Sequence, residues 1–231
     1  MPIVMTKTYS TGTGDPNNLN IGDPFGGGFY AGKMSIDGSI YAIICSPNAN
    51  NVNGLNHKTS NTTDGVAAQS VNDGWTTTEA NNNAAHPMAQ YVRSLSVGGF
   101  TDWYIPSRDE MELIYRNLGN MAALRSTQTR SPSGQLGDAA GSIGSGDNRN
   151  SVPTRQAYSI EFKDATPKTP VAFTPGVTTV YLTSTETTAN GGQIYGMFTS
   201  TTNPGSQSSW SKSGVGGNGN FWCRPIRRIK L

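Results

Sequence analysis

The sequence predicts an α+β domain, and three features of the 231-residue chain support this class. The dipeptide Asp37-Gly38 separates two β-prone runs, 29–36 and 39–45, which is typical of a tight β-hairpin because both central residues can adopt positive φ. Apolar residues at helical spacing follow in the middle of the chain. Short β-prone runs fill its last part, and because strands and helices do not alternate regularly, a βαβ arrangement is not expected.

One helix is predicted with agreeing local signals after the β-prone run 102–105. Ser107 and Glu110 have the spacing of a capping box directly after Pro106. The apolar face of this helix would be formed by Met111, Ile114, Tyr115 and Leu118. Trp103 lies just before it and is expected in the core. We therefore predict that Trp103, Ser107 and Glu110 determine the fold here.

A second helix is predicted earlier in the chain. Thr76 and Glu79 also have capping-box spacing, and Pro87 is expected to kink the helix or to restart it. Its apolar face would contain Ala84, Met88, Tyr91, Val92 and Leu95.

The remaining segments complete the predicted organisation. Residues 1–24 form a polar leader that is expected to act as an anchoring arm, and residues 25–231 form one domain. Residues 125–155 are rich in Gly, Ser and Asn and are expected to form a flexible loop. Further short strands are expected at 157–162, 179–184, 193–199, 207–211 and 221–229.

Composition points to a surface of short, uncharged polar groups. Only 34% of the residues are hydrophobic and 14% are charged, while 28 are Gly. Such a composition, with many Asn, Thr and Ser residues, can hold irregular loops at modest entropic cost and is common in extracellular β-proteins and viral coats. The 7 Phe, 9 Tyr and 4 Trp residues argue against a disordered chain.

Charge and hydropathy exclude several classes of partner. The net charge of +2 does not supply the basic face that nucleic-acid binding needs. The basic residues at the C-terminus are expected on the solvated face of a last strand: Arg224, Arg227, Arg228 and Lys230. No stretch is apolar enough to span a bilayer, and the opening residues lack a secretion signal, so we expect synthesis in the cytoplasm and no membrane insertion. Cys45 and Cys223 are expected to be buried thiols, although the sequence leaves their pairing open.

No catalytic constellation is evident, so we expect no enzyme activity. His57 and His86 lack the neighbours of a zinc or nucleophile site. The spacing assigns no acid and nucleophile roles among the carboxylates Asp102, Asp109, Glu110, Glu112 and Glu186. No cofactor is expected. Calcium is the alternative for the loop residues Asp64, Asp73, Asp138 and Asp147, although turn formation explains them equally well.

Aromatic residues among small polar neighbours are the remaining candidates for function. Trp210 lies in SQSSWSKSG and is the best candidate for an exposed ring that anchors a ligand, although packing beneath the Gly-rich loop 214–220 explains it equally well. The loops of the late strands are expected to meet at one end of the domain. The predicted ligand-binding residues there are Tyr195, Asn203, Trp210, Asn218, Asn220 and Trp222.

Several motifs occur in an order that resembles a known family. They are GGGFYAGKMSIDGSIYAIICSP, NDGWTTTEANNNAAHPMAQYVRSL, GGFTDWYIPSRDEMELIYRNL, NSVP, YLTSTE and FWCRPIRR. Over roughly residues 22–229 the chain resembles the Lcl C-terminal-like family of phage tail-fibre and adhesin-like proteins. Residues 102–107 match the family's D-W-x-L-P-[ST] run, whereas Leu182 replaces a usual Trp and Cys223 and Pro225 alter the closing strand.

The resemblance implies a C-type lectin-like fold, because the family is related in pattern to formylglycine-generating enzymes and phage tropism determinants. It implies a phage virion surface protein, with receptor binding in a tail fibre or baseplate as the first hypothesis. The alternatives are a structural decoration protein of the capsid or tail, and a glycan hydrolase. The expected partners are other virion proteins, bound through the leader, and a host glycan or protein. A homotrimer is expected by analogy with phage fibres.

Overall fold

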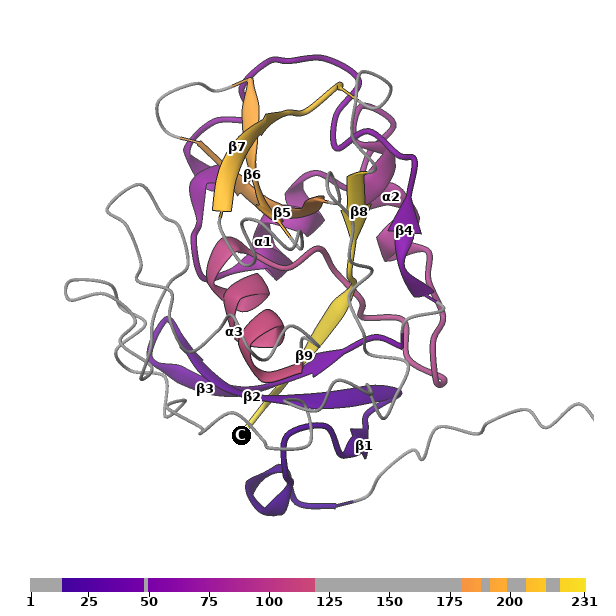
Figure 1. The fold of residues 1–231 in the computed structure, drawn as a ribbon, viewed down its shortest axis with the longest axis vertical. Helices are drawn as coiled ribbons and strands as arrows, with labels where there is room; N and C mark the ends of the chain where they lie inside the picture. Colours follow the sequence, from indigo (N-terminus) through magenta and orange to yellow (C-terminus); the bar gives the residue numbers. More distant parts are fainter. Residues whose placement is uncertain (1–13, 48–49, 119–179, 188–191, 199–206, 215–220) are drawn as a thin grey trace, which may run out of the picture.

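In the computed structural model, the described residues are 14–47, 50–118, 180–187, 192–198, 207–214 and 221–231 (Figure 1). This part of the chain is a mixed α+β structure with three α-helices and two sheets, which confirms the predicted class. The first sheet has the order β1 (Pro24–Phe25), β2 (Gly28–Ile36), β3 (Ser39–Cys45) and β9 (Ile226–Lys230). The second has the order β4 (Val52–Asn53), β8 (Phe221–Cys223), β5 (Val180–Glu186), β6 (Gln193–Phe198) and β7 (Gln207–Ser211).

The predicted hairpin at Asp37-Gly38 is confirmed. Ile36 pairs with Ser39 across the turn, and Asp37 and Gly38 have φ values of 48° and 79°, as a two-residue hairpin loop requires. The last strand of the chain, β9, pairs antiparallel with β3. The C-terminal segment therefore lies beside the first hairpin and forms one edge of the first sheet.

The predicted helix near Thr76 is two helices, α1 (Gly74–Ala80) and α2 (Pro87–Arg93). A new helix therefore begins at Pro87, and there is no single kinked helix. The predicted capping box is wrong. The N-cap of α1 is Asp73, whose carboxylate accepts hydrogen bonds from the backbone N–H and the hydroxyl of Thr76, both at 2.9 Å. A short 3₁₀ turn, Val66–Gln69, precedes them. None of the helices described here has the length and apolar character needed to cross a bilayer.

The predicted capping box of α3 (Arg108–Leu118) is confirmed. The backbone N–H of Ser107 donates to Oε2 of Glu110 at 2.8 Å, and the Glu110 N–H donates to Oγ of Ser107 at 3.4 Å. The core assignment of Trp103 is also confirmed, since its side chain is fully buried. The strand predicted at 102–105 is wrong, because only an isolated bridge joins Tyr104 to Ile226.

Helix α3 lies between the two sheets (Figure 1) and contacts β2 and β3 of the first and β5 and β6 of the second. Its buried face includes Met111, Ile114 and Leu118, which the apolar spacing predicts. The helix therefore joins both sheets into one hydrophobic core.

The late strands agree with the predicted ranges except at the end of the chain. The run 221–229 is divided into β8 and β9 at Arg224 and Pro225, and the two strands belong to different sheets. Proline lacks the N–H that a continuous central strand needs, so the chain changes sheet at this point. The strand at 157–162 and the loop at 125–155 fall outside the described residues.

The described end of the leader packs against the domain. After a 3₁₀ turn, Pro16–Asn18, Ile21 is only 7% exposed and belongs to the core. Gly22 donates its N–H to the carbonyl of Tyr30 at 2.8 Å, and Tyr30 donates to Asp23 at 2.9 Å. Ile21, Gly22 and Asp23 therefore belong to the packed structure, although the sequence assigned them to the anchoring arm.

The expectation that the basic C-terminal residues lie on a solvated face is confirmed for Lys230, which is exposed, and is wrong for Arg224 and Arg227, which are buried. Arg224 is fully buried, and Arg227 is 7% exposed. The guanidinium group of Arg227 binds both carboxylate oxygens of Asp102 at 2.7 and 2.9 Å. The cysteines are buried free thiols, as predicted, and burial raises the pKa of Cys45 to about 11 despite the nearby Arg224.

Candidate functional site

Three of the predicted ligand-binding residues lie in the second sheet. Tyr195 on β6 and Trp210 on β7 belong to neighbouring strands, and Trp222 on β8 pairs with Tyr181 of β5. The other three fall outside the described residues: Asn203, Asn218 and Asn220.

Of the two alternatives for Trp210, the structure favours packing over a freely exposed ring. The ring is partly buried and packs edge-on against Phe221, with ring centroids 5.6 Å apart. It crosses the backbone of Gly196, where a Cβ would lie 2.9 Å from its Cδ1 atom. Trp210 therefore covers one face of the second sheet, which is a packing role.

Strand register places four chain segments at one end of the second sheet. Val180 pairs with both Phe198 and Phe221, and Met197 pairs with Gln207. The start of β5, the end of β6 and the starts of β7 and β8 therefore lie together. The late loops were expected to meet at one end of the domain. The described residues that flank them do lie together at this end of the second sheet.

Glu110 has a structural role beyond the capping box. Its Oε2 atom also accepts the N–H of Gly74 at 3.0 Å, and its Oε1 accepts the hydroxyl of Tyr104 at 2.6 Å. Burial raises the pKa of the Glu110 carboxyl, while these hydrogen bonds oppose the shift. Because its oxygens are used by three donors within the core, this carboxylate is a structural group.

Glu186 is also engaged, in a buried ionic cluster formed by Lys58, Asp64, His86, Glu186 and Lys212. The Lys212 ammonium group lies 2.6 Å from Glu186 and 2.7 Å from Asp64. Burial raises the pKa of Asp64, but hydrogen bonds from Lys212, Lys58 and His86 outweigh it and lower the pKa to about 2. The cluster therefore holds the loop that contains Asp64 against β5.

The histidines are structural, as predicted. His86 binds Asp64 at 3.0 Å and Asn83 at 2.9 Å, and His57 is 1% exposed. Burial, together with the charge of Lys212, lowers the pKa of His57 to about 3. Within the described ranges, no three His, Cys, Asp or Glu side chains converge on a position for a metal ion.

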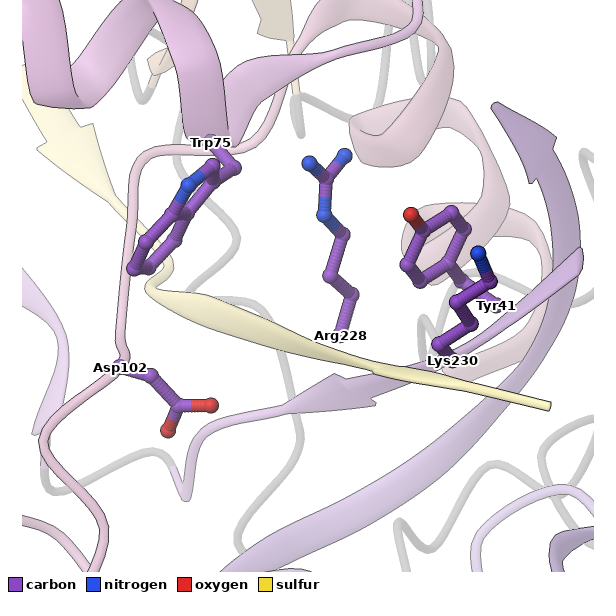
Figure 2. A pocket seen from close by; sticks show the side chains of 5 residues that line it. All are labelled: Tyr41, Trp75, Asp102, Arg228 and Lys230. Carbon is purple, nitrogen blue, oxygen red and sulfur yellow. The ribbon is translucent and has the colours of Figure 1, made fainter. Parts of the chain in front are cut away.

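A pocket of about 240 Å³ lies between the first sheet and α1 (Figure 2). Its lining residues are Tyr41, Trp75, Asp102, Arg228 and Lys230. Tyr41 on β3 and Lys230 on β9 are cross-strand partners, and Arg228 lies two residues earlier on the same face of β9. In Figure 2, the side chains of Trp75 and Tyr41 stand on either side of Arg228.

The pocket side chains are held in place by contacts with one another and with residues outside the pocket. Arg228 forms an ion pair with Asp73 at 2.9 Å, and its guanidinium carbon lies 4.7 Å from the ring centroid of Tyr41. Trp75 packs edge-on against Tyr104, with centroids 5.8 Å apart, and Arg93 lies 4.4 Å from the Trp75 centroid. Such supporting contacts keep a binding site close to one geometry.

One positively charged side chain of the pocket, that of Lys230, is not balanced by a neighbouring carboxylate among the described residues. Arg228 is balanced by Asp73, and Asp102 is balanced by Arg227. Lys230 is exposed and has no ion-pair partner in the described part of the chain. Burial lowers the pKa of Arg228, but the neighbouring Tyr104, Asp73 and Glu110 raise it above its usual range, so the floor of the pocket is charged at neutral pH.

The lining of the pocket contains two aromatic rings, two cationic groups and one carboxylate. Aromatic faces can pack against the C–H face of a sugar, and Asp102, Arg228 and Lys230 can exchange hydrogen bonds with its hydroxyls. The sequence missed this site because its residues come from four separated segments. The sequence signals were Asp102, named among carboxylates with no assignable catalytic role, and the C-terminal basic residues, which were expected on a solvated strand face.

Comparisons of this chain with protein-family models, with curated proteins and with solved structures found no match.

Proposed function

We propose that this chain is a binding module on the surface of a phage virion, where it recognises a glycan or protein of the host. The pocket between Tyr41 and Trp75 is the observation that carries this proposal. It combines aromatic walls with Asp102 and Arg228, whose positions are fixed by ion pairs, and with the exposed ammonium group of Lys230. The carboxylates Glu110 and Glu186, in contrast, are bound to structural partners within the core, which favours binding over hydrolysis.

The proposal includes the C-type lectin-like fold and the Lcl C-terminal-like family. The α+β architecture and the pairing of the C-terminal strand with the first hairpin support this assignment. In this account the leader attaches the module to another virion protein, and three copies assemble. A fold alone does not define a ligand, so the function depends on the pocket.

Competition for adsorption tests the function. Purified chain in excess should reduce adsorption of the phage that carries it. Tyr41→Ala should abolish this effect, whereas Tyr91→Ala should preserve it, because Tyr91 is a 48% exposed ring on α2 outside the pocket. Thermal unfolding of both variants would verify that they fold.

Two results would contradict the proposal. Full competition by folded Tyr41→Ala protein would exclude the pocket as the receptor site. Absence of competition by the parent chain, together with immunogold labelling of intact virions, would identify a decoration protein that does not bind the receptor.

A further inference from the structure

We propose that the pocket binds a single acidic sugar ring, with the ring against Trp75 and its carboxylate directed to Lys230. This inference rests on the proposed binding function and specifies the chemical class of its ligand. It is carried by the size of the pocket, by its unbalanced charge and by the positions of its two rims.

The size of the pocket limits the ligand to about one ring. Its volume of about 240 Å³ is below the range of roughly 300–1,000 Å³ that is typical of sites for drug-sized molecules. A monosaccharide unit, either free or at the end of a glycan, fits this volume. A longer oligosaccharide would have to extend past the exposed Lys230.

The charge of the pocket selects an anion. Two of its charged side chains are already paired, Arg228 with Asp73 and the part-exposed Asp102 with Arg227. Of the three charged lining residues, Lys230 alone has no ion-pair partner within the described part of the chain, and it stands at the rim. A carboxylate placed there completes a third pair, whereas a neutral ligand leaves the ammonium group unpaired.

A cationic ligand is disfavoured by the same geometry. Aromatic rings often bind cations, but both rings of this pocket already have one: Arg93 lies 4.4 Å from Trp75, and Arg228 lies 4.7 Å from Tyr41. A further positive charge would be repelled by Arg228 and Lys230. Because Arg93 is not among the lining residues, the Trp75 ring still offers the pocket a surface for stacking.

The rims of the pocket orient the acid. In Figure 2, Asp102 lies on the side of Trp75 and Lys230 lies on the side of Tyr41. The carboxylate of Asp102 repels an acidic group and accepts hydrogen bonds from sugar hydroxyls instead. The acid of the ligand is therefore directed toward Lys230 and the hydroxyls toward Asp102.

Titration of the full chain with sodium D-glucuronate, and with D-glucose as the neutral equivalent, tests the inference. At low salt, D-glucuronate should bind about two- to fivefold more tightly than D-glucose, since an exposed ion pair contributes a modest amount. Lys230→Gln should remove this preference. The control Lys33→Gln should retain it, because Lys33 is a partly buried lysine on β2 whose ammonium group binds Asn17 outside the pocket. The preference should also diminish at 1 M salt.

The outcomes separate this inference from the function on which it rests. Equal binding of the two sugars, or a preference that survives Lys230→Gln, would overturn the acidic ligand and leave the pocket as a sugar site. If neither sugar binds while the parent chain still competes for phage adsorption, the inference fails and the receptor-binding function stands. If the chain neither binds the sugars nor competes, both fail.

Discussion

Replacement of Glu110 by Ala should destabilise the domain far more than loss of a helix cap. The carboxylate accepts hydrogen bonds from the N–H of Ser107, the N–H of Gly74 and the hydroxyl of Tyr104. Each buried donor left without a partner costs about 1–3 kcal/mol. The free energy of unfolding should therefore fall by about 3–5 kcal/mol, since the three penalties are not fully additive.

The variant Ser107→Ala isolates the capping contribution. It removes the one acceptor for the Glu110 N–H and should cost about 1 kcal/mol. Glu79→Ala is the matched control on α1, because the Glu79 side chain is 40% exposed and contacts only Arg93 among the interactions described. An exposed ion pair of this kind contributes less than about 1 kcal/mol.

Urea denaturation of the three variants measures these differences as shifts in the midpoint at constant m-value. The reasoning predicts that the loss follows the order Glu110→Ala, Ser107→Ala, Glu79→Ala. A Glu110→Ala protein no less stable than Ser107→Ala would show that the bonds from Gly74 and Tyr104 contribute nothing beyond the cap.

Three further predictions follow from burial and titration. Trp103→Ala should cost about 3–5 kcal/mol in the same assay, because the ring is fully buried, and a parent-like melt would contradict its core position. Because the pKa of His57 is about 3 in the folded state and ordinarily about 6.5, only the unfolded chain binds the proton between these values. Stability should therefore fall as the pH drops below 6.5, by about 3 kcal/mol from this residue at pH 4.5, and His57→Gln should make the pH dependence shallower. Deletion of residues 1–13 should leave the melting temperature unchanged but prevent incorporation into virions, whereas deletion of residues 1–24 should lower the melting temperature by removing Ile21 from the core. Incorporation of the shorter deletion would contradict the anchoring role.

Local sequence signals predicted the elements that depend on neighbouring residues. The Asp37-Gly38 turn and the Ser107–Glu110 box each need contacts only within a few positions, and both are confirmed. The α1 cap was misplaced, since Thr76 and Asp73 both suit an N-cap and the structure uses Asp73. Its carboxylate also binds Arg228, a contact that local spacing does not reveal.

Contacts between distant segments could not be read from the sequence. Gly74 must lie against the start of α3, where a Cβ would stand 2.6 Å from Oε2 of Glu110, yet the two residues are 36 positions apart. A run of basic residues near the C-terminus usually indicates a solvated strand face. Arg227 is buried instead because Asp102, 125 positions earlier, neutralises it. The pocket depends on the same long-range pairs, so it became visible only in the structure.

The tryptophan indole N–H signals in a proton–nitrogen NMR spectrum test the central claim most directly. The chain has 4 Trp residues, so each signal reports one position during titration with D-glucuronate. The account predicts a progressive shift of the Trp75 signal, while Trp210 and Trp222 in the second sheet remain unchanged. A shift of Trp210 or Trp222 without Trp75 would place the site on the surface of the late strands and contradict the assignment of the pocket.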